Sequence, residues 1–145
     1  MTQNEENALK LENQLCFPLY AASRKVISLY APYLKTLGIT YTQYIVFMAL
    51  WEKDGVSISE LGKRLYLDNG TLTPLLKKME NKGYLTRTRS KDDERIVLIN
   101  LTKNGKNMKE KCKSLPFSVG NFMKLEKEKA KTLYILLYEI LESLQ

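Results

Sequence analysis

The sequence predicts a mainly α-helical domain that carries one small β-hairpin. Apolar residues recur at helical spacing along nearly the whole chain, and the period changes to that of strands only between Leu85 and Leu101. The 145 residues, 44% of them hydrophobic, are enough to fill the core of one domain. No internal repeat or low-complexity tract occurs, so we expect a single domain over residues 1–145.

The first two segments of the chain have the pattern of helices. Apolar residues keep helical spacing from about Leu9 to Tyr33, and this pattern is broken by Pro18 and Pro32. Next, in TYTQYIVFMALWE, Thr40 precedes a glutamine by three residues, which is the capping box that begins a helix. The apolar stripe of this second helix is Tyr44, Phe47, Met48 and Trp51.

A short helix, a turn and another helix are predicted to follow. In SISELGKRLY, Ser57 caps the helix and Glu60 returns the bond, while the buried stripe consists of Ile58, Leu61 and Leu65. Asp68, Asn69 and Gly70 in a row predict a tight turn. The helix in TLTPLLKKMENKGYL should hold Pro74 in its first turn, because deeper in the helix the ring would clash and remove a needed N–H group. Its apolar face is Leu72, Leu75, Leu76 and Met79, and Gly83 fits a left-handed helix end.

The segment after this helix predicts a β-hairpin. The runs LTRTR and IVLINL are rich in Thr, Ile and Val, and six polar residues, SKDDER, separate them. Two strands alone are marginally stable, so the hairpin must pack on the helices. The helical pattern resumes after Thr102 through about Leu115 and stalls at Pro116 and Gly120. A last helix is predicted over Glu126–Leu144, where apolar residues lie close to heptad spacing.

Composition limits the function classes. The chain has 23 Lys and Arg against 16 Asp and Glu, a net charge of +7, which favours a polyanion such as nucleic acid as the partner. With two cysteines and no histidine, we expect no disulfide framework, no metal site, no cofactor and no histidine-dependent catalysis. The polar, acidic start MTQNEENALK is not a secretory signal, and no apolar run is long enough to span a membrane. We therefore expect a cytoplasmic protein that is not an enzyme and has no membrane partner.

A helix-turn-helix followed directly by a strand pair is a winged helix-turn-helix, which we place at about residues 40–102. Its second helix leaves small and basic residues off the apolar face, suited to base edges and phosphates, namely Thr71, Thr73, Pro74, Lys77 and Lys78. The hairpin adds Arg87, Arg89, Lys91 and Arg95, and an arginine on a thin loop can enter a minor groove. The same residues would also fit an ordinary solvated helix face and a charged turn.

Several motifs resemble the MarR-type winged-helix regulators. Asp93 and Arg95, then the apolar strand, then Leu101, Thr102 and Gly105 match the wing signature of that family. More narrowly, LENQLCFPLY, YTQYIVFMALWE and LYLDNGTLTPLLKKME resemble its organic-hydroperoxide-sensing, OhrR-like branch. The resemblance covers most of the chain and weakens after about Lys113.

The resemblance implies a redox-controlled, dimeric repressor. Cys16 would be the sensor, oxidised by organic hydroperoxides and able to form a mixed disulfide with a low-molecular-weight thiol, and three tyrosines would hydrogen-bond the thiolate: Tyr20, Tyr30 and Tyr41. Arg95 would enter the minor groove, oriented by Asp93, and the DNA-binding set would include Asp68 and Asn69. The partner would be a pseudo-palindromic double-stranded operator, and approximately residues 1–35 and 114–145 would form the dimerisation helices.

Spacing adds a condition to the tyrosine assignment. Fourteen residues separate Cys16 from Tyr30, so on one helix they lie about 21 Å apart. They meet only if the helix lies antiparallel to its copy in a two-fold dimer. Without the family, Tyr20 and Tyr30 are better explained as core or interface residues, because a chain with nine tyrosines gives such spacings by coincidence.

Both cysteines allow more than one interpretation. If Pro18 lies in the first helical turn, Cys16 stands at a helix start, where a thiolate is favoured; if Pro18 merely kinks a longer helix, that argument fails. Cys112 either packs on an apolar helix stripe or acts as a resolving thiol. A ligand in a groove could replace the thiol switch, its lining being Phe17, Tyr20, Phe47, Met48 and Trp51. A thiol peroxidase and a basic interaction protein are the remaining hypotheses.

Overall fold

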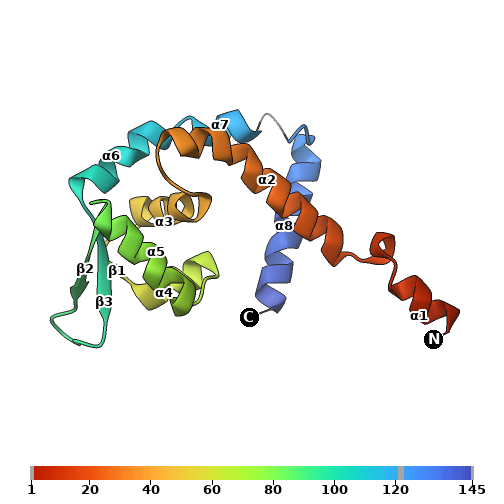
Figure 1. Ribbon diagram of the computed structural model, residues 1–145, viewed down its shortest axis with the longest axis horizontal. Helices are drawn as coiled ribbons and strands as arrows, with labels where there is room; N and C mark the ends of the chain where they lie inside the picture. Colours follow the sequence, from red (N-terminus) through yellow and green to blue (C-terminus); the bar gives the residue numbers. More distant parts are fainter. Residues whose placement is uncertain (1, 121–122, 145) are drawn as a thin grey trace. The chain divides into compact units, whose positions relative to one another are not determined.

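The computed structural model describes residues 2–120 and 123–144, and the chain divides into two compact units, residues 1–115 and 116–145. The first unit contains the helices α1 to α6 and a small sheet, and the second contains α8 (Figure 1). The predicted class, mainly α with a β-hairpin in a winged helix-turn-helix, is confirmed. No helix in the described ranges is long and apolar enough to cross a membrane.

The N-terminal region is a short helix, a 3₁₀ turn and a long helix. Helix α1 spans Gln3–Ala8, the 3₁₀ turn spans Leu11–Asn13, and α2 spans Cys16–Thr36. Because α2 begins at Cys16, Pro18 is its third residue and needs no helical N–H partner, so the first-turn hypothesis holds and the kink hypothesis does not. Pro32 does not break the pattern as expected: α2 continues through it to Thr36.

The helix-turn-helix consists of α3 (Tyr41–Glu52), α4 (Ile58–Leu65) and α5 (Asn69–Asn81). The Thr40 capping box is present. At α4, however, only half of the expected box forms: Ser57 accepts from the Glu60 N–H, but the Glu60 carboxylate pairs with Lys53 at 2.6 Å instead. The side chain is drawn to the cation because an ion pair is a stronger partner than a neutral N–H group.

Two expectations about α5 are wrong. Asp68 does not begin a tight turn with Asn69 and Gly70; it is the N-cap of α5, and the left-handed residue of the turn is Tyr66, with φ of 54°. Since the helix begins at Asn69, Pro74 is its sixth residue and not in the first turn. The carbonyl that Pro74 leaves without a helical partner belongs to Gly70, which is exposed and therefore open to hydration.

The sheet has three antiparallel strands, one more than the predicted hairpin. Strand β2 (Leu85–Arg89) pairs with β3 (Val97–Leu101), with Leu85 opposite Leu101 and Arg89 opposite Val97. The additional strand, β1 (Val56–Ser57), pairs with the other side of β3, so the order is β1-β3-β2 and β2 is an outer strand. Gly83, with φ of 72°, ends α5 in the left-handed conformation as predicted.

The C-terminal elements are α6 (Lys103–Cys112), α7 (Leu115–Gly120) and α8 (Lys127–Ser143). The pattern was expected to stall at Pro116 and Gly120, but both lie within α7, where proline is tolerated because it stands in the first turn. The predicted helix over Glu126–Leu144 is confirmed as α8.

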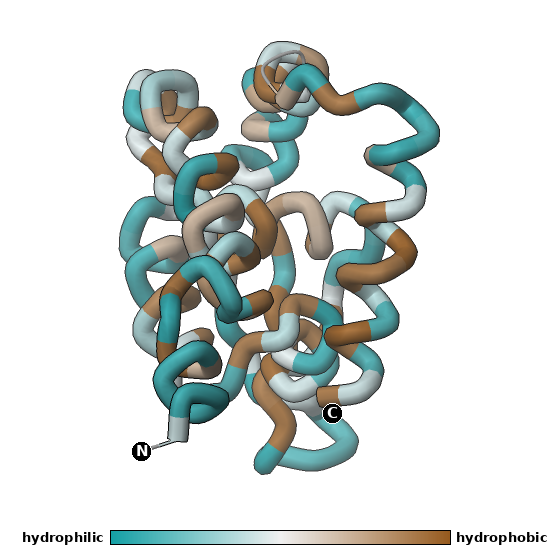
Figure 2. The backbone as a smooth tube through the Cα atoms, turned by 90° about the vertical axis from the view of Figure 1, so that its right-hand side faces the viewer, coloured by the Kyte–Doolittle hydropathy of each residue, from teal (hydrophilic) through white to brown (hydrophobic). Residues whose placement is uncertain are grey.

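The core of the first unit lies between α3, α4, α5, α6 and the sheet. Its fully buried side chains include Phe47, Leu61, Leu72, Met79 and Ile99. Hydrophobic and hydrophilic residues alternate along the helices, as amphipathic packing requires (Figure 2). This core fixes α5 and the hairpin, which carry the predicted DNA-contacting residues.

Candidate nucleic-acid interface and thiol site

The outer face of α5 is built as the sequence predicted. Leu72, Leu76 and Met79 are buried, and the small and basic residues of the opposite face are all exposed: Thr71, Thr73, Pro74, Lys77 and Lys78. Asp68 begins this face by accepting the Thr71 N–H at 2.7 Å and the Thr71 hydroxyl at 3.2 Å, which lowers the pKa of the Asp68 carboxyl. The helix thus presents hydroxyls near its N terminus and two lysines further along, and Asn69 stands exposed at its first position.

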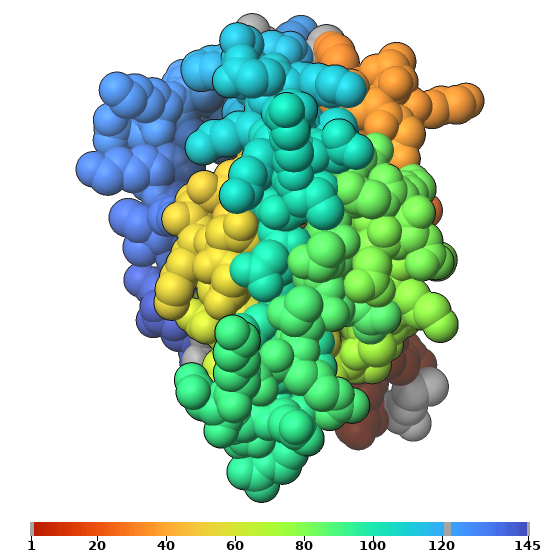
Figure 3. Space-filling view, turned by 90° about the vertical axis from the view of Figure 1, so that its left-hand side faces the viewer, coloured from red at the N-terminus to blue at the C-terminus, as the bar shows by residue number. Residues whose placement is uncertain are grey.

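The tip of the hairpin is held in shape by two arginines. Arg89 donates through Nη1 to the Glu94 carbonyl at 2.6 Å, which closes the tip. Arg95 donates through Nε and Nη2 to both oxygens of Asp93, each at 3.0 Å, and this pair lowers the pKa of the Asp93 carboxyl. The Arg95 side chain is still 90% exposed, and Lys91 of the same connection between the strands is also exposed. The tip of the hairpin projects from the body of the unit (Figure 3).

Arg87 was predicted to contact DNA, but in the structure it pairs with Glu80 of α5. Its Nε donates to Glu80 at 2.9 Å, its backbone N–H donates to the same carboxylate at 3.1 Å, and its side chain is only 26% exposed. The guanidinium is directed at α5 because β2 runs back alongside that helix after a short connection. The Glu80 partner was not identified from the sequence.

Cys16 and its predicted tyrosine partners do not meet within one chain. Cys16 is exposed at the first position of α2, and Tyr20 accepts a hydrogen bond from Arg24 at 2.9 Å. Tyr30 lies further along the same helix and packs on Tyr41, with ring centroids 5.0 Å apart. The structure therefore brings Tyr30 and Tyr41 together but leaves Cys16 and Tyr20 at the other end of α2.

The sequence prediction missed a third member of the tyrosine cluster. Tyr44 packs against Tyr30 at 5.9 Å and Tyr41 at 6.3 Å between ring centroids. Burial raises the pKa of Tyr30 and of Tyr41, and it raises the pKa of Tyr44 to about 12, with smaller contributions from Tyr30, Cys112 and Tyr41. The three hydroxyls thus keep their protons and can donate hydrogen bonds. The signal was present, since Tyr44 follows Tyr41 by three residues on one helix.

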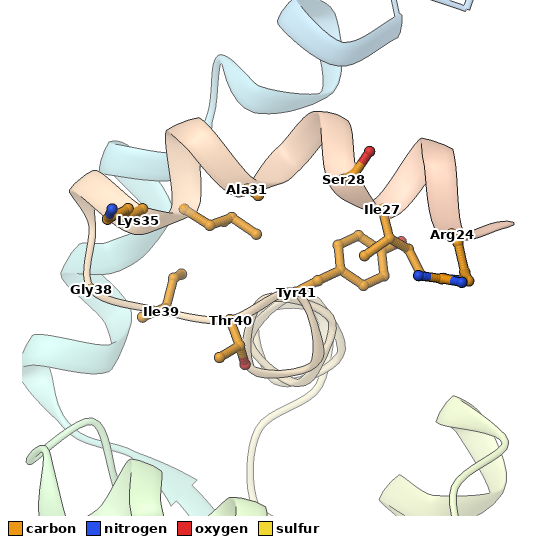
Figure 4. A pocket seen from close by; sticks show the side chains of 10 residues that line it. Arg24, Ile27, Ser28, Ala31, Lys35, Gly38, Ile39, Thr40 and Tyr41 are labelled. Atoms are coloured by element: carbon orange, nitrogen blue, oxygen red, sulfur yellow. The ribbon is translucent and has the colours of Figure 1, made fainter. Parts of the chain in front are cut away.

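An open groove of about 630 Å³ runs along α2 beside the start of α3. Arg24 and Ile27 of α2 lie beside the ring of Tyr41, and the lining also includes Ser28 and Ala31 of α2 and the loop of residues 38–40 (Figure 4). None of the five residues expected to line a ligand groove borders this one. Phe47 is fully buried, and Phe17 and Tyr20 are exposed near the start of α2, so that set does not form one groove.

Cys112 is packed in the core. It is 2% exposed, among the same buried residues as Met108 and Leu115, and burial raises the pKa of its thiol. The structure thus favours packing over a resolving role. Within the described ranges, no group of three or more His, Cys, Asp or Glu side chains is placed to hold a metal ion.

The helix-turn-helix with its basic wing is the architecture of a winged-helix DNA-binding protein. The chain belongs to the SarA/Rot family of transcriptional regulators, which matches residues 28–112. It is 47% identical to the organic hydroperoxide resistance transcriptional regulator of Bacillus subtilis, over 98% of this chain and 97% of that protein.

Solved structures support the same class. Reduced AbfR bound to DNA, a protein of Staphylococcus epidermidis, is 33% identical with a TM-score of 0.80 over 99% of this chain and 100% of that one. A mutant of E. coli MarR in complex with operator DNA is 29% identical with a TM-score of 0.81, over 88% of this chain and 93% of that one. The resemblance to MarR-type regulators and to their organic-hydroperoxide branch is confirmed, and these relatives are regulators rather than thiol peroxidases.

Proposed function

We propose that this protein is a homodimeric, cytoplasmic repressor that leaves its operator when an organic hydroperoxide oxidises Cys16. The observation that carries the proposal is an exposed thiol at the first position of a long helix whose surrounding surface is apolar. Similarity to a hydroperoxide resistance regulator and to a reduced DNA-bound regulator supports it.

Exposed apolar side chains support the dimer. In α2 and just before it, Leu15 is 80% exposed, and Phe17, Leu19 and Ile27 are also exposed. In α8, described by itself, the exposed apolar residues are Leu133, Tyr134, Ile135, Leu136, Tyr138 and Ile140. Surfaces of this kind are usually buried in an interface, so residues 1–35 and 114–145 are the dimerisation segments of the proposal.

The dimer also explains how Cys16 reaches its tyrosines. Along α2, Cys16 and Tyr30 of one chain are about 21 Å apart, so an antiparallel copy brings the thiol of one subunit to the Tyr30–Tyr41 pair of the other. The groove beside Tyr41 offers the space for the partner's helix start. Tyr20 approaches the site from the thiol's own helix.

The redox step needs only the thiolate and the oxidant. The Cys16 sulfur attacks the terminal oxygen of the hydroperoxide, an S–O bond forms, the O–O bond breaks, and the alkoxide leaves and takes a proton from water. Cys16 is oxidised by two electrons to sulfenic acid and the hydroperoxide is reduced to an alcohol. A low-molecular-weight thiol then condenses with the sulfenic acid, forming a mixed disulfide and releasing water.

DNA recognition in this proposal uses α5 and the wing tip. The hydroxyls of Thr71 and Thr73 lie toward base edges, Lys77 and Lys78 toward phosphates, and Arg95 enters the minor groove with Asp93 holding its plane. Asp68 serves through the cap of α5, with Asn69, Pro74, Arg89 and Lys91 completing the contact surface. Two-fold symmetry places the half-sites of the operator about one helical turn apart.

A mobility-shift experiment on the DNA upstream of the protein's own gene tests the proposal. Wild type, Cys16→Ser and the matched control Cys112→Ser are each titrated with cumene hydroperoxide and then dithiothreitol. We expect wild type and Cys112→Ser to release DNA and to rebind on reduction, and Cys16→Ser to stay bound. Release of Cys16→Ser protein by hydroperoxide contradicts the thiol switch.

A second candidate function is release by an organic anion. The groove beside α2 combines apolar Ile27, Ala31 and Leu34 with the cations Arg24 and Lys35, which suits an aromatic acid. In that case an aromatic acid weakens DNA binding equally in wild type and in a variant without cysteine.

A further inference from the structure

The recognition helix and the wing are joined by a carboxylate that makes two contacts. Glu80, in the last turn of α5, accepts the Nε–H of Arg87 at 2.9 Å and the backbone N–H of the same residue at 3.1 Å. Arg87 is the middle residue of β2. The pair is partly withdrawn from solvent, with side chains 26% and 31% exposed, so water and salt screen it less than a surface pair.

The hydrogen bond from the Arg87 N–H to Glu80 satisfies a backbone donor on the open edge of an outer strand. Strand β2 has β3 on one side and, among residues 2–120 and 123–144, no strand on the other, so its outward N–H groups lack sheet partners. Arg87 lies opposite Ile99 of β3, yet its N–H points to Glu80. The carboxylate thus occupies the position of the next strand, and α5 closes the edge of the sheet at this point.

A second attachment of the wing lies at its root. There the Thr102 hydroxyl donates to the Gly83 carbonyl at 2.6 Å, the Thr102 N–H donates to the Tyr84 carbonyl at 3.1 Å, and the Leu101 N–H donates to Asp54 at 2.9 Å. Pairing of β1 with Leu98 and Ile99 holds the β3 side of the hairpin, and at this level the outer strand β2 is held through Arg87. Attachment at Arg87 as well fixes the direction in which the hairpin projects.

The hairpin extends far enough beyond Arg87 that a small rotation there displaces its tip. Five residues from Arg87 to Asp92 span at most about 17 Å, so a pivot of ~15° moves the tip by up to about 4 Å. Such a shift is larger than the length of a hydrogen bond and removes Arg95 from a groove.

We propose that Glu80 and Arg87 are positioning residues that set the angle between the recognition helix and the wing, so that α5 and Arg95 enter their grooves together. Arg87 on this view is not a phosphate ligand, because Glu80 neutralises it. The proposal rests on the proposed function for its DNA readout only.

Neutralising Glu80 changes operator affinity in opposite directions according to whether Glu80 positions the wing or acts only through its charge. Removing a negative charge near DNA strengthens binding when only electrostatics act. The matched control is Glu94→Gln, which removes the same charge from an exposed side chain of the wing. We expect Glu94→Gln to bind the operator as tightly as wild type or tighter, and Glu80→Gln to bind at least fivefold more weakly.

A double-mutant cycle shows whether the loss acts through the wing tip. In wild type, Arg95→Ala should weaken operator binding at least tenfold, whereas in the Glu80→Ala background the same change should cost less than threefold. Full additivity of the two losses, or tighter binding by Glu80→Gln, overturns the proposal.

Amide hydrogen exchange on the free protein separates this proposal from the proposed function. The Arg87 amide should exchange slowly in wild type and in Glu94→Ala, and at least tenfold faster in Glu80→Ala, while core amides such as that of Leu76 stay protected in all three. An Arg87 amide whose exchange does not change in Glu80→Ala refutes the attachment, whether or not wild type binds DNA.

Discussion

Replacement of Lys78 gives a quantitative prediction for the DNA-binding face. Lys78 is exposed on α5, and in the proposed two-fold dimer Lys78→Ala would remove two phosphate contacts from one operator complex. Each contact contributes about 0.9 to the slope of log affinity against log salt, so the slope should fall by about 1.8. Between ~50 and ~200 mM salt, wild type should then lose about 12-fold more affinity than the variant.

Fluorescence anisotropy of a labelled operator, measured over this salt range, gives both slopes. Lys109→Ala is the control, since it removes the same charge from the exposed side of α6, away from the wing tip in Figure 1. Its slope should equal that of wild type. An unchanged slope for Lys78→Ala, or an equal fall for both variants, refutes the assignment of this face to DNA.

Three further predictions concern the thiols and the core. In native protein a thiol reagent should label Cys16 at least about tenfold faster than Cys112, because Cys112 is buried and the pKa of its thiol is raised. Mass spectrometry measures both labelling rates, which should become similar in urea. Similar rates in the native protein contradict the burial of Cys112. The Tyr44 hydroxyl holds its proton more tightly in the folded than in the unfolded protein. Its contribution to the free energy of unfolding is therefore complete below pH 10.0 and is lost as pH rises toward its folded pKa of about 12. In urea unfolding Tyr44→Phe should reduce this loss of stability at high pH, and a pH profile equal to that of wild type contradicts the assignment to Tyr44. Gly105→Ala should lower the free energy of unfolding by about 3 kcal/mol, because the new Cβ would overlap the Tyr84 carbonyl and lie 2.9 Å from a Leu101 methyl; a change below ~1 kcal/mol contradicts this.

Local chemistry made much of the fold predictable. The caps at Thr40 and Ser57 and the left-handed Gly83 depend on residues within one turn, so the sequence alone indicates them. Strand β1 was missed because its two residues become a strand only by pairing with β3, which follows about forty residues later. The start of α5 was misplaced because Asp68 suits a turn and an N-cap equally well.

In the candidate site, too, local features were predictable from the sequence and tertiary contacts were not. Helical periodicity was sufficient to predict that Thr73 and Lys77 are exposed opposite the buried Leu76. It gave no information on Arg87, whose charge suggested DNA contact, because the pair with Glu80 forms only when the wing folds back along α5. The direction of a charged side chain depends on tertiary placement, and composition does not report it.

The energy needed to release the operator is compatible with the proposed thiol site. Changing the ratio of DNA-binding to non-binding dimer from 99:1 to 1:99 requires about 5.5 kcal/mol. Two-fold symmetry divides this energy into about 2.7 kcal/mol for each of the two thiols. A hydrogen bond to a charged group contributes about 1.5–3 kcal/mol. Tyr30 and Tyr41 keep their protons because burial raises the pKa of each hydroxyl, so they are able to donate to a thiolate from the partner. In the proposed dimer, loss of one or two such bonds at each Cys16 on oxidation would supply this energy without any direct contact between the thiol and the DNA-binding face.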